Sequence, residues 1–328
     1  MRLTPDAALT LVRETLVRSN TSDTNAGHVA DALVAAELVG QSGHGLRRMP
    51  SYAGQALSGK VDGHANPTLG RTRPGVISID AANGFAYPAI ALAEEALPPI
   101  VRDQGVAIAG IRRSHHAGVT GLVVERLAEQ GLVALMLVNS PPAMAPWGGT
   151  TALLGTNPVA FAVPTASEPI VIDLSLSEVA RGKVMAAKQK GEPIPEGWAF
   201  DSEGNPTTDP DAALSGTMAP AGGAKGAVLA LMVELLAAGL TGANYASDAS
   251  SFFETGGTPP GTGQFLLSID PDAVAVGGVE RFAALADAIE ADPGARLPGR
   301  RRRELAAERA GGFEVDDDLL RTIDQLGR

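Results

Sequence analysis

The chain has 328 residues, of which 45% are hydrophobic and 19% are charged, and its formal net charge is −11. Single hydrophobic cores stop growing near about 250–300 residues, so this length predicts two or three domains. The negative charge argues against a nucleic-acid partner, because binding a phosphate backbone needs a concentrated basic face. The chain contains no cysteine, which excludes disulfides, a thiolate nucleophile and a zinc–thiolate site.

The amino-terminal segment and the apolar runs give no targeting or membrane signal. Arginines and acids interrupt the first 19 residues, MRLTPDAALTLVRETLVRS, so they lack the apolar core of a signal peptide. The longest apolar run, residues 228–240, contains Glu234 and is shorter than the roughly 20 residues that cross a bilayer. We therefore expect a cytoplasmic protein without a membrane partner, and we interpret this run as a buried helix.

The amino-terminal part is predicted to be helical. Thr4 is a suitable N-cap for a first helix, Ser22 or Asp23 for a second, and Gly40 ends the second. A third helix is predicted over residues 46–57, with Gly59 as its carboxyl-terminal stop. The connector at residues 41–44 therefore lies between two helix ends.

From residue 76 onward the pattern changes to short apolar strands separated by helices. The predicted strands are 76–79, 106–111, 132–138, 159–163, 170–172 and 265–269, and the helices between them are 89–102, 121–130 and 227–240. This alternation predicts an α/β fold. We expect a helical segment over 1–75 that packs with the helices of 271–328, and an α/β body over 76–270 with a long loop at 187–222.

A glycine-rich stretch over residues 144–164, MAPWGGTTALLGTNPVAFAVP, predicts a pocket. Its glycines permit close approach of a ligand, and Thr156 and Asn157 offer hydrogen bonds. A loop between two buried strands is the alternative interpretation. No GxGxxG follows a strand, so a Rossmann dinucleotide site has no support. No histidine has a helical metal-ligand partner, and we expect no metal site.

Several segments carry residues suited to anions. His44 and Arg48 are four apart on one helix face, which places an imidazole beside a guanidinium that can bind a carboxylate. The motif SHHAG, residues 114–118, precedes a helix whose free N–H groups would favour a phosphate. Lys225 lies in GGAKGA at another helix start. Several anion sites without a nucleophile or metal fit a dinucleotide and a small carboxylate substrate.

Together these segments resemble the type 2 malate/L-lactate dehydrogenase superfamily over residues 5–315. The segments that carry the resemblance are GHGLRRMPSY (43–52), SGKVDG (58–63), SHHAG (114–118), NSPPAMAPWGG (139–149), LLGTNPVAFAVP (153–164), ARGKV (180–184), IPEGWAFDSEGNPTTDP (194–210), GGAKGA (222–227) and ARLPGRRR (295–302). Residues 222–244 and 249–271 look most like the reductases of Δ1-pyrroline-2-carboxylate and Δ1-piperideine-2-carboxylate. The resemblance implies a non-Rossmann α/β fold with helical amino- and carboxyl-terminal parts, NADPH as cofactor with NADH as a second possibility, and a homodimer.

The resemblance also implies a role for each matching residue. The catalytic candidates are His44, His116 and Lys183. The substrate-binding candidates are Arg48, Thr156, Arg181 and Gly182. The cofactor-binding candidates are His116, Ala117, Gly118, Val119, Thr120, Asp173, Leu174, Ser175, Ala224, Lys225, Arg296, Leu297, Pro298, Gly299, Arg300 and Arg301.

The sequence departs from the family pattern at one position, and a second position bears on the subfamily, since the resemblance implies a lysine there in many hydroxy-acid dehydrogenases. The common Ser-His-Gly reads Gly43-His44-Gly45, and Lys183 stands where some imino-acid reductases have an acidic residue. The expected reaction is NADPH-dependent reduction of a cyclic 2-imino acid to L-proline or L-pipecolate, with His44 as proton donor. The alternatives are a 2-hydroxy-acid dehydrogenase for lactate, malate or ureidoglycolate with His116 as base, and a binding protein that lost catalysis.

Overall fold

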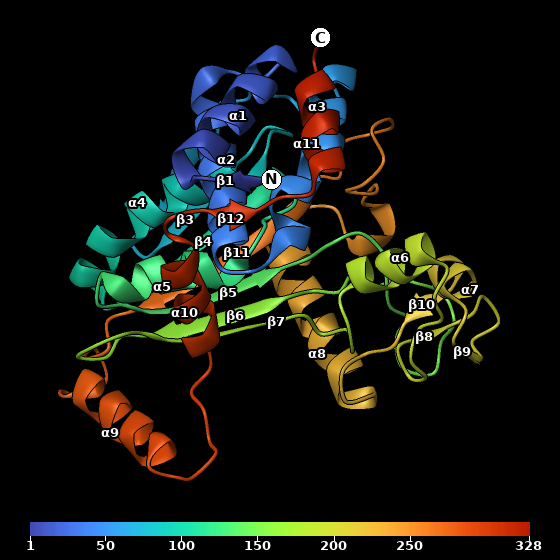
Figure 1. Cartoon of the computed structure of the whole chain (residues 1–328). Coiled ribbons are helices and arrows are strands. Elements are labelled where there is room, and N and C mark those ends of the chain that lie inside the picture. Colours follow the sequence, from blue (N-terminus) through green and yellow to red (C-terminus); the bar gives the residue numbers. More distant parts are fainter.

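The structure, a computed structural model, describes all residues 1–328 and is built around a seven-stranded mixed sheet (Figure 1) with the order β2-β3-β4-β11-β5-β6-β7. The strands of this sheet are β2 (Thr68–Arg73), β3 (Val76–Asp80), β4 (Val106–Ser114), β5 (Val133–Val138), β6 (Val159–Val163), β7 (Ile170–Leu174) and β11 (Thr262–Ile269). Only β3 and β4 are parallel neighbours; the other pairs are antiparallel. The predicted α/β class and the six predicted strands are confirmed.

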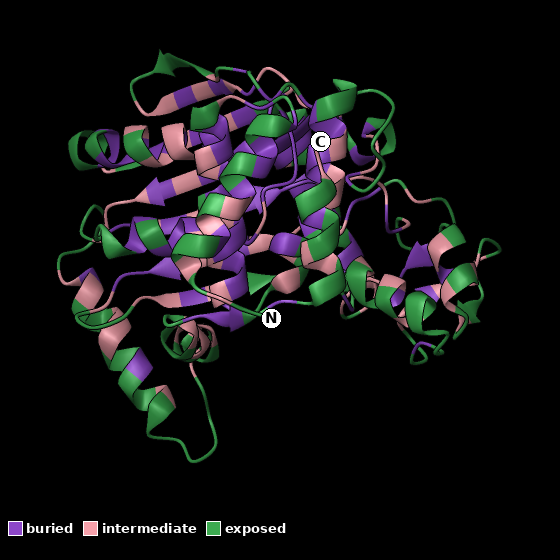
Figure 2. Cartoon of the chain, turned by 45° about the horizontal axis from the view of Figure 1, so that its top comes forward, coloured by how far each residue is buried: buried purple, intermediate pink, exposed green.

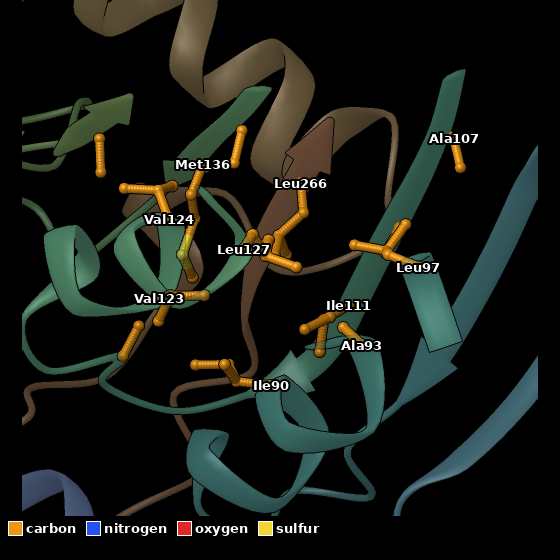
Figure 3. Close-up of a cluster of buried hydrophobic side chains, with 14 of the residues drawn as sticks. Ile90, Ala93, Leu97, Ala107, Ile111, Val123, Val124, Leu127, Met136 and Leu266 are labelled. Atoms are coloured by element: carbon orange, nitrogen blue, oxygen red, sulfur yellow. The ribbon is translucent and has the colours of Figure 1, made fainter. Parts of the chain in front are cut away.

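Helices cover both faces of the sheet. Helices α4 (Ala86–Gln104) and α5 (Thr120–Glu129) pack on one face, where their side chains meet those of β4, β5 and β11 (Figure 3). Helix α8 (Ala224–Glu234) and the π-helical turn that follows it, Leu235–Gly239, pack on the other face. Successive side chains of a strand point to opposite faces of the sheet. On β11, Leu266 therefore packs with the buried side chains of α4 and α5, and Phe265 packs with those of α8.

The amino-terminal helices form a third cluster with the end of the chain. They are α1 (Pro5–Arg18), α2 (Asp23–Leu38) and α3 (Met49–Ser58), with 3-10 turns at Ser42–His44 and Leu46–Arg48. Thr4 and Ser22 cap the first two helices through their side chains, and Gly59 ends α3 in the left-handed conformation, as predicted. Ile323 of α11 (Asp317–Gln325) is buried among them, and β1 (Arg2–Leu3) pairs with β12 (Phe313–Glu314).

Three expectations about local structure are wrong. Residues 68–73 form β2 instead of a helix or loop; every residue of that strand is exposed, so it has no apolar alternation to detect. The expected loop at 187–222 contains a small sheet and two helices. Its elements are the end of α6 (Arg181–Lys190), β8 (Ala199–Phe200), β9 (Pro206–Thr207), α7 (Pro210–Ser215) and β10 (Thr217–Met218). Its strands have only two residues each, which is too short for a periodic signal.

The third correction concerns α8, which is not a buried helix. Its inner face packs on the sheet, but its outer face exposes Val228, Leu229, Leu231 and Met232, and Leu235 of the following turn is 54% exposed. An apolar pattern all round a helix predicts full burial, but in this chain one face of α8 has no partner.

The remaining helices extend from the sheet edge. Helix α9 (Gly278–Glu290) projects from the body, and its residues are mostly exposed or intermediate (Figure 2). Helix α10 (Arg300–Arg309) returns to contact α2. None of the helices is both long enough and apolar enough to span a bilayer.

Candidate active site

One edge of the sheet gathers the polar segments that the sequence singles out. Strand β4 ends at Ser114, which pairs with Thr262 at the start of β11. On the neighbouring strands, Asn139 follows β5, and Thr156 lies just before β6, the antiparallel partner of β5. Leu174, the last residue of β7, pairs with the first residue of β6. The register therefore brings the SHHAG motif, the glycine-rich segment and the end of β7 to the same edge.

Two histidines at this edge form a direct pair. His44 Nδ1 lies 3.0 Å from His116 Nε2, and their rings stack with centroids 5.0 Å apart. The other ring nitrogen of His116, Nδ1, lies 2.6 Å from the Tyr52 hydroxyl. The two catalytic candidates therefore belong to one hydrogen-bonded unit, although 72 positions separate them in the chain.

Burial keeps both members of this pair neutral near pH 7. It lowers the pKa of His44 to about 4, and the charge of Arg48 adds to the effect. Burial and the same guanidinium hold the pKa of His116 well below its usual range. A neutral imidazole carries one N–H and one lone pair, so the pair can either donate a hydrogen bond to a substrate or accept a proton from it, depending on the tautomer.

Arg48 is a buried cation without a carboxylate partner. Its side chain is 9% exposed, its Nε donates to Gly43 O at 2.8 Å, and its Nη1 has no partner in the chain. Its guanidinium lies 4.6 Å from the centroid of the Phe253 ring. A desolvated guanidinium with an unused donor indicates an anionic ligand, because leaving a buried charged donor unpaired is costly.

The connector that contains His44 is hydrogen-bonded to Glu37 of α2. The carboxylate of Glu37 is buried and accepts from the Ser42 hydroxyl at 2.7 Å and from Leu46 N at 2.8 Å. A side chain at Gly45 would begin 2.3 Å from Glu37 Oε1, so only glycine fits there. The hydroxyl of Ser42 is therefore occupied by Glu37, and no serine beside His44 replaces the one that the family has in place of Gly43.

A segment at residues 251–255 places two aromatic rings against the site. Lys60, which is buried, donates to Ser251 O at 2.7 Å and to Glu254 O at 2.9 Å, and Gln55 Nε2 donates to Phe252 O at 3.1 Å. Phe252 then contacts the His116 ring, with centroids 5.4 Å apart, and the next residue, Phe253, covers Arg48. These contacts exclude water from His116 and from one face of the guanidinium, whereas His44 remains half-buried.

His115, the neighbour of His116, is a buried histidine whose two ring nitrogens have no hydrogen-bond partner. Its ring is enclosed by Tyr52, Phe85 and Phe252, with centroids 5.2–5.8 Å away. Burial lowers its pKa to about 3. Its environment is that of a phenylalanine, and its two unpaired nitrogens reduce the stability of the fold.

We expect His115→Phe to raise the free energy of unfolding by about 1–3 kcal/mol at pH 7. As the pH falls from about 6.5 toward 4, the unfolded chain binds protons that the buried histidines do not, so wild-type stability falls by ~1.4 kcal/mol per pH unit for each such histidine. In His115→Phe, the free energy of unfolding should depend less steeply on pH, because one of the buried histidines is gone. Denaturant unfolding at pH 7 and pH 5 measures both effects, and an unchanged pH dependence would contradict the assignment of His115 as neutral.

Of the remaining substrate and catalytic candidates, Thr156 and Arg181 lie at the sheet edge, whereas Gly182 and Lys183 lie at the surface. The hydroxyl of Thr156 is 3.2 Å from that of Ser140, so it lies on the same sheet edge. Arg181 reaches toward this edge, since its Nη1 donates to Pro142 O at 3.4 Å. Gly182 and Lys183 are exposed on the first turn of α6, and Lys183 Nζ lies 5.8 Å from the Trp198 ring centroid. No hydrogen bond or ion pair links Lys183 to either histidine.

The expectation that the start of α5 offers its free N–H groups to a phosphate is wrong. Asp173 already occupies this helix start, accepting from the Thr120 hydroxyl at 2.9 Å and from Gly121 N at 2.8 Å. The end of β7 places this carboxylate where the positive end of the helix dipole favours an anion. Arg302 lies 3.7 Å from the same carboxylate.

Other cofactor candidates surround this point. Ala117 and Val119 are buried, Gly118 has a φ of +70°, and Ser175 and Leu174 follow Asp173 at the edge. Ala224 and Lys225 begin α8, close to the edge because Ala221 N donates to Leu176 O at 2.9 Å. The turn of Leu297, Pro298 and Gly299 reaches β7, since a Cβ at Gly299 would lie 3.2 Å from Val171 O.

The arginine cluster divides into paired and unpaired members. Arg300 pairs with Glu290 and Glu304, and Arg302 pairs with Glu125. Arg296 and Arg301 are exposed and form no ion pair. Arg302 fixes α10 against α5 through Glu125, and Arg300 links α10 to α9, which leaves Arg296 and Arg301 available to an anionic ligand.

Comparison with known proteins identifies the family of this chain. Residues 3–324 match the family described as malate/L-lactate dehydrogenase. The chain belongs to the malate/L-lactate dehydrogenase family. The chain is 53% identical to a (2R)-3-sulfolactate dehydrogenase (NADP(+)) from Chromohalobacter salexigens. The aligned 292 residues cover 89% of this chain and 87% of that protein.

Imino-acid reductases are also close relatives of this family member. A Δ1-pyrroline-2-carboxylate/Δ1-piperideine-2-carboxylate reductase from Pseudomonas syringae pv. tomato is 41% identical over 323 residues, which cover 96% of this chain and 93% of that protein. The crystal structure of the Δ1-piperideine-2-carboxylate reductase from the same source superposes with a TM-score of 0.94 at 39% identity and covers 99% of both chains. The predicted resemblance is confirmed, and the chain is an oxidoreductase that uses a nicotinamide cofactor.

Several residues of the site were not found from the sequence. Tyr52 lies four positions after Arg48, so helical spacing could have revealed it. Glu37, Tyr87 and Phe253 carry no local signal, because each reaches the site from a different element.

Proposed function

We propose that this chain interconverts a 2-oxo acid and a 2-hydroxy acid with NADP(H), and that its substrate carries a second anionic group, as 3-sulfolactate does. The observation that carries this proposal is the buried guanidinium of Arg48, which has no carboxylate partner and lies beside a neutral histidine pair. Arg48 binds the carboxylate next to the reacting carbon, and the histidine pair contacts the oxygen that gains negative charge as hydride arrives. The cofactor supplies the hydride when bound.

The charges near this edge support a substrate with two anionic groups. Arg181 and Lys183 form no ion pair, and neither does Arg48. The second anion would interact with Arg181, whose guanidinium lies between the sheet edge and α7, donating to Pro142 O at 3.4 Å and to Leu214 O at 3.2 Å. A protonated cyclic 2-imino acid is a zwitterion with a single carboxylate, so it offers no second anionic group to the unpaired cations. The 53% identity to a sulfolactate dehydrogenase supports the same choice.

Reduction of a cyclic 2-imino acid is the second candidate. It is favoured by the 41% identity to an imino-acid reductase and by the superposition on a crystal structure of such an enzyme. In that reaction His44 would supply the proton to nitrogen. Lys183, which stands where some imino-acid reductases have an acidic residue, weighs against it.

Steady-state kinetics with NADPH separates the candidates. We expect kcat/KM for 3-sulfopyruvate to exceed that for pyruvate by at least roughly tenfold, because one more charge-assisted contact contributes about 1.5–3 kcal/mol. Oxaloacetate tests whether a second carboxylate replaces the sulfonate. A higher kcat/KM for Δ1-pyrroline-2-carboxylate than for every oxo acid would overturn the first proposal in favour of the second.

The unpaired arginines support NADPH as the preferred cofactor. A 2′-phosphate adds charge that a guanidinium can bind through two hydrogen bonds. We expect Arg301→Ala to raise KM for NADPH roughly tenfold and to leave KM for NADH nearly unchanged. Arg300→Ala is the matched control, because that guanidinium already pairs with Glu290 and Glu304. Equal effects of Arg301→Ala on both cofactors would remove Arg301 from the 2′-phosphate site.

We further propose that the exposed face of α8 is the contact of a homodimer. Val228 and Leu235 are 63% and 54% exposed, and an apolar face of this kind is a usual protein interface. The double variant Val228→Glu/Leu235→Glu is expected to be monomeric in size-exclusion chromatography with light scattering. Val274→Glu, at a residue 93% exposed outside this face, is the control. A dimeric double variant would place the interface elsewhere.

A further inference from the structure

A row of hydrogen-bonding groups runs from His44 into the core. Behind the pair of His44 and His116, the Tyr52 hydroxyl lies 2.6 Å from His116 Nδ1 and 3.0 Å from the Tyr87 hydroxyl. Tyr52 is fully buried, Tyr87 is 7% exposed, and they come from α3 and α4. Four side chains from separate parts of the sequence therefore form one line that ends at the substrate edge.

Hydrogen-bond accounting gives this line a direction. The Tyr87 hydroxyl has one partner, Tyr52, so its proton is satisfied only if Tyr87 donates to Tyr52. The Tyr52 hydroxyl then accepts that bond, and its own proton goes to His116 Nδ1. In the opposite direction the Tyr87 O–H would be a buried donor without an acceptor, which is costlier than an unused lone pair on a hydroxyl oxygen.

The direction fixes the tautomers of both histidines. A neutral His116 that accepts at Nδ1 carries its proton on Nε2 and donates it toward His44 Nδ1. His44 then carries its own proton on Nε2, the nitrogen without a partner in the chain. We propose that Tyr52, oriented by Tyr87, is a positioning residue that holds His44 in the Nε2–H form, with this N–H as the donor presented to the substrate.

This arrangement gives a neutral histidine a catalytic use. An N–H donated to the carbonyl oxygen stabilises the negative charge that develops as hydride reaches the adjacent carbon, and no imidazolium is required beforehand. The oxygen then takes the Nε2 proton, and His44, which is only half-buried, regains a proton from solvent, so one hydride and one proton are consumed in each turnover. The glycine at position 118 leaves room for the Tyr87 hydroxyl, because a Cβ there would lie 2.9 Å from it. The inference rests on the proposed function of this site, but the tautomers themselves can be measured without substrate.

Nitrogen-15 NMR of histidine side chains in the full-length protein, without substrate, tests the proposal. The wild type is expected to show His44 and His116 as neutral Nε2–H tautomers, assigned by comparison with His44→Ala and His116→Ala. In Tyr52→Phe the signals of His116 should move toward a mixture of tautomers, because its Nδ1 has lost the donor. Unchanged signals in Tyr52→Phe, or Nδ1–H tautomers in the wild type, would overturn the proposal.

Steady-state kinetics of the three tyrosine variants tests the same proposal, and the loss of kcat should be larger for the tyrosine nearer His116. Tyr52→Phe should lower kcat for reduction roughly tenfold with little change in KM, Tyr87→Phe should have a smaller effect, and Tyr245→Phe should have none. Tyr245 is the third tyrosine of the chain and packs its hydroxyl against Gly239, away from the pair. Equal kcat in Tyr52→Phe and wild type would also overturn the proposal. If no oxo acid is turned over, the proposed function fails while the tautomer result still stands.

Discussion

Replacing Arg48 with alanine is expected to lower kcat/KM for the anionic substrate roughly tenfold to hundredfold and to leave cofactor affinity nearly unchanged. The buried guanidinium has an unused Nη1 donor and no carboxylate partner. A charge-assisted contact to the substrate carboxylate would use that donor and contributes about 1.5–3 kcal/mol. Steady-state kinetics with substrate and cofactor varied separately measures both parts of the expectation.

Two control variants separate the role of this side chain from its charge. Arg47 is exposed and adjacent, so Arg47→Ala removes one positive charge from the same turn without touching the site and should have little effect. Arg48→Lys keeps the charge but cannot bind a carboxylate through two parallel hydrogen bonds, so we expect it to recover only part of the activity. A folded Arg48→Ala variant with an unchanged KM for substrate would remove Arg48 from the site.

His44→Ala and His116→Ala are each expected to lower the rate of the chemical step by about 10²–10⁴. Because the two rings are hydrogen-bonded directly, removing either one disables the same unit. The double variant should therefore be little worse than either single variant, as is usual for groups that act together. Single-turnover reduction with excess enzyme measures the step without a contribution from product release.

His64→Ala is the matched control for the histidine variants, because that side chain is exposed in a loop. Near-normal reduction by His44→Ala together with an inactive His116→Ala that still binds NADPH would assign the proton chemistry to His116 alone. Multiplicative losses in the double variant would mean that the two histidines act independently, which contradicts a shared role.

Local spacing was enough to predict much of the fold and part of the site. Alternating apolar residues predicted six strands of the main sheet, and Thr4, Ser22 and Gly59 marked helix ends, because caps and periodicity depend on neighbours a few positions apart. By contrast, the prediction that His44 and Arg48 share one helix face is wrong, because they end two separate 3-10 turns, Ser42–His44 and Leu46–Arg48, with a non-helical Gly45 between them. Strand β2 and the two-residue strands of the small sheet gave no periodic signal.

The sequence by itself determined the α/β class and the residue types available for binding an anion, since these depend on local pattern and composition. Only the tertiary structure decided that His44 meets His116, that Tyr52 and Tyr87 stand behind them, and that Asp173 occupies the start of α5. It also decided that one apolar face of α8 stays exposed. These features depend on contacts between elements far apart in the chain, where strand order and burial, and not spacing along the sequence, determine which groups meet.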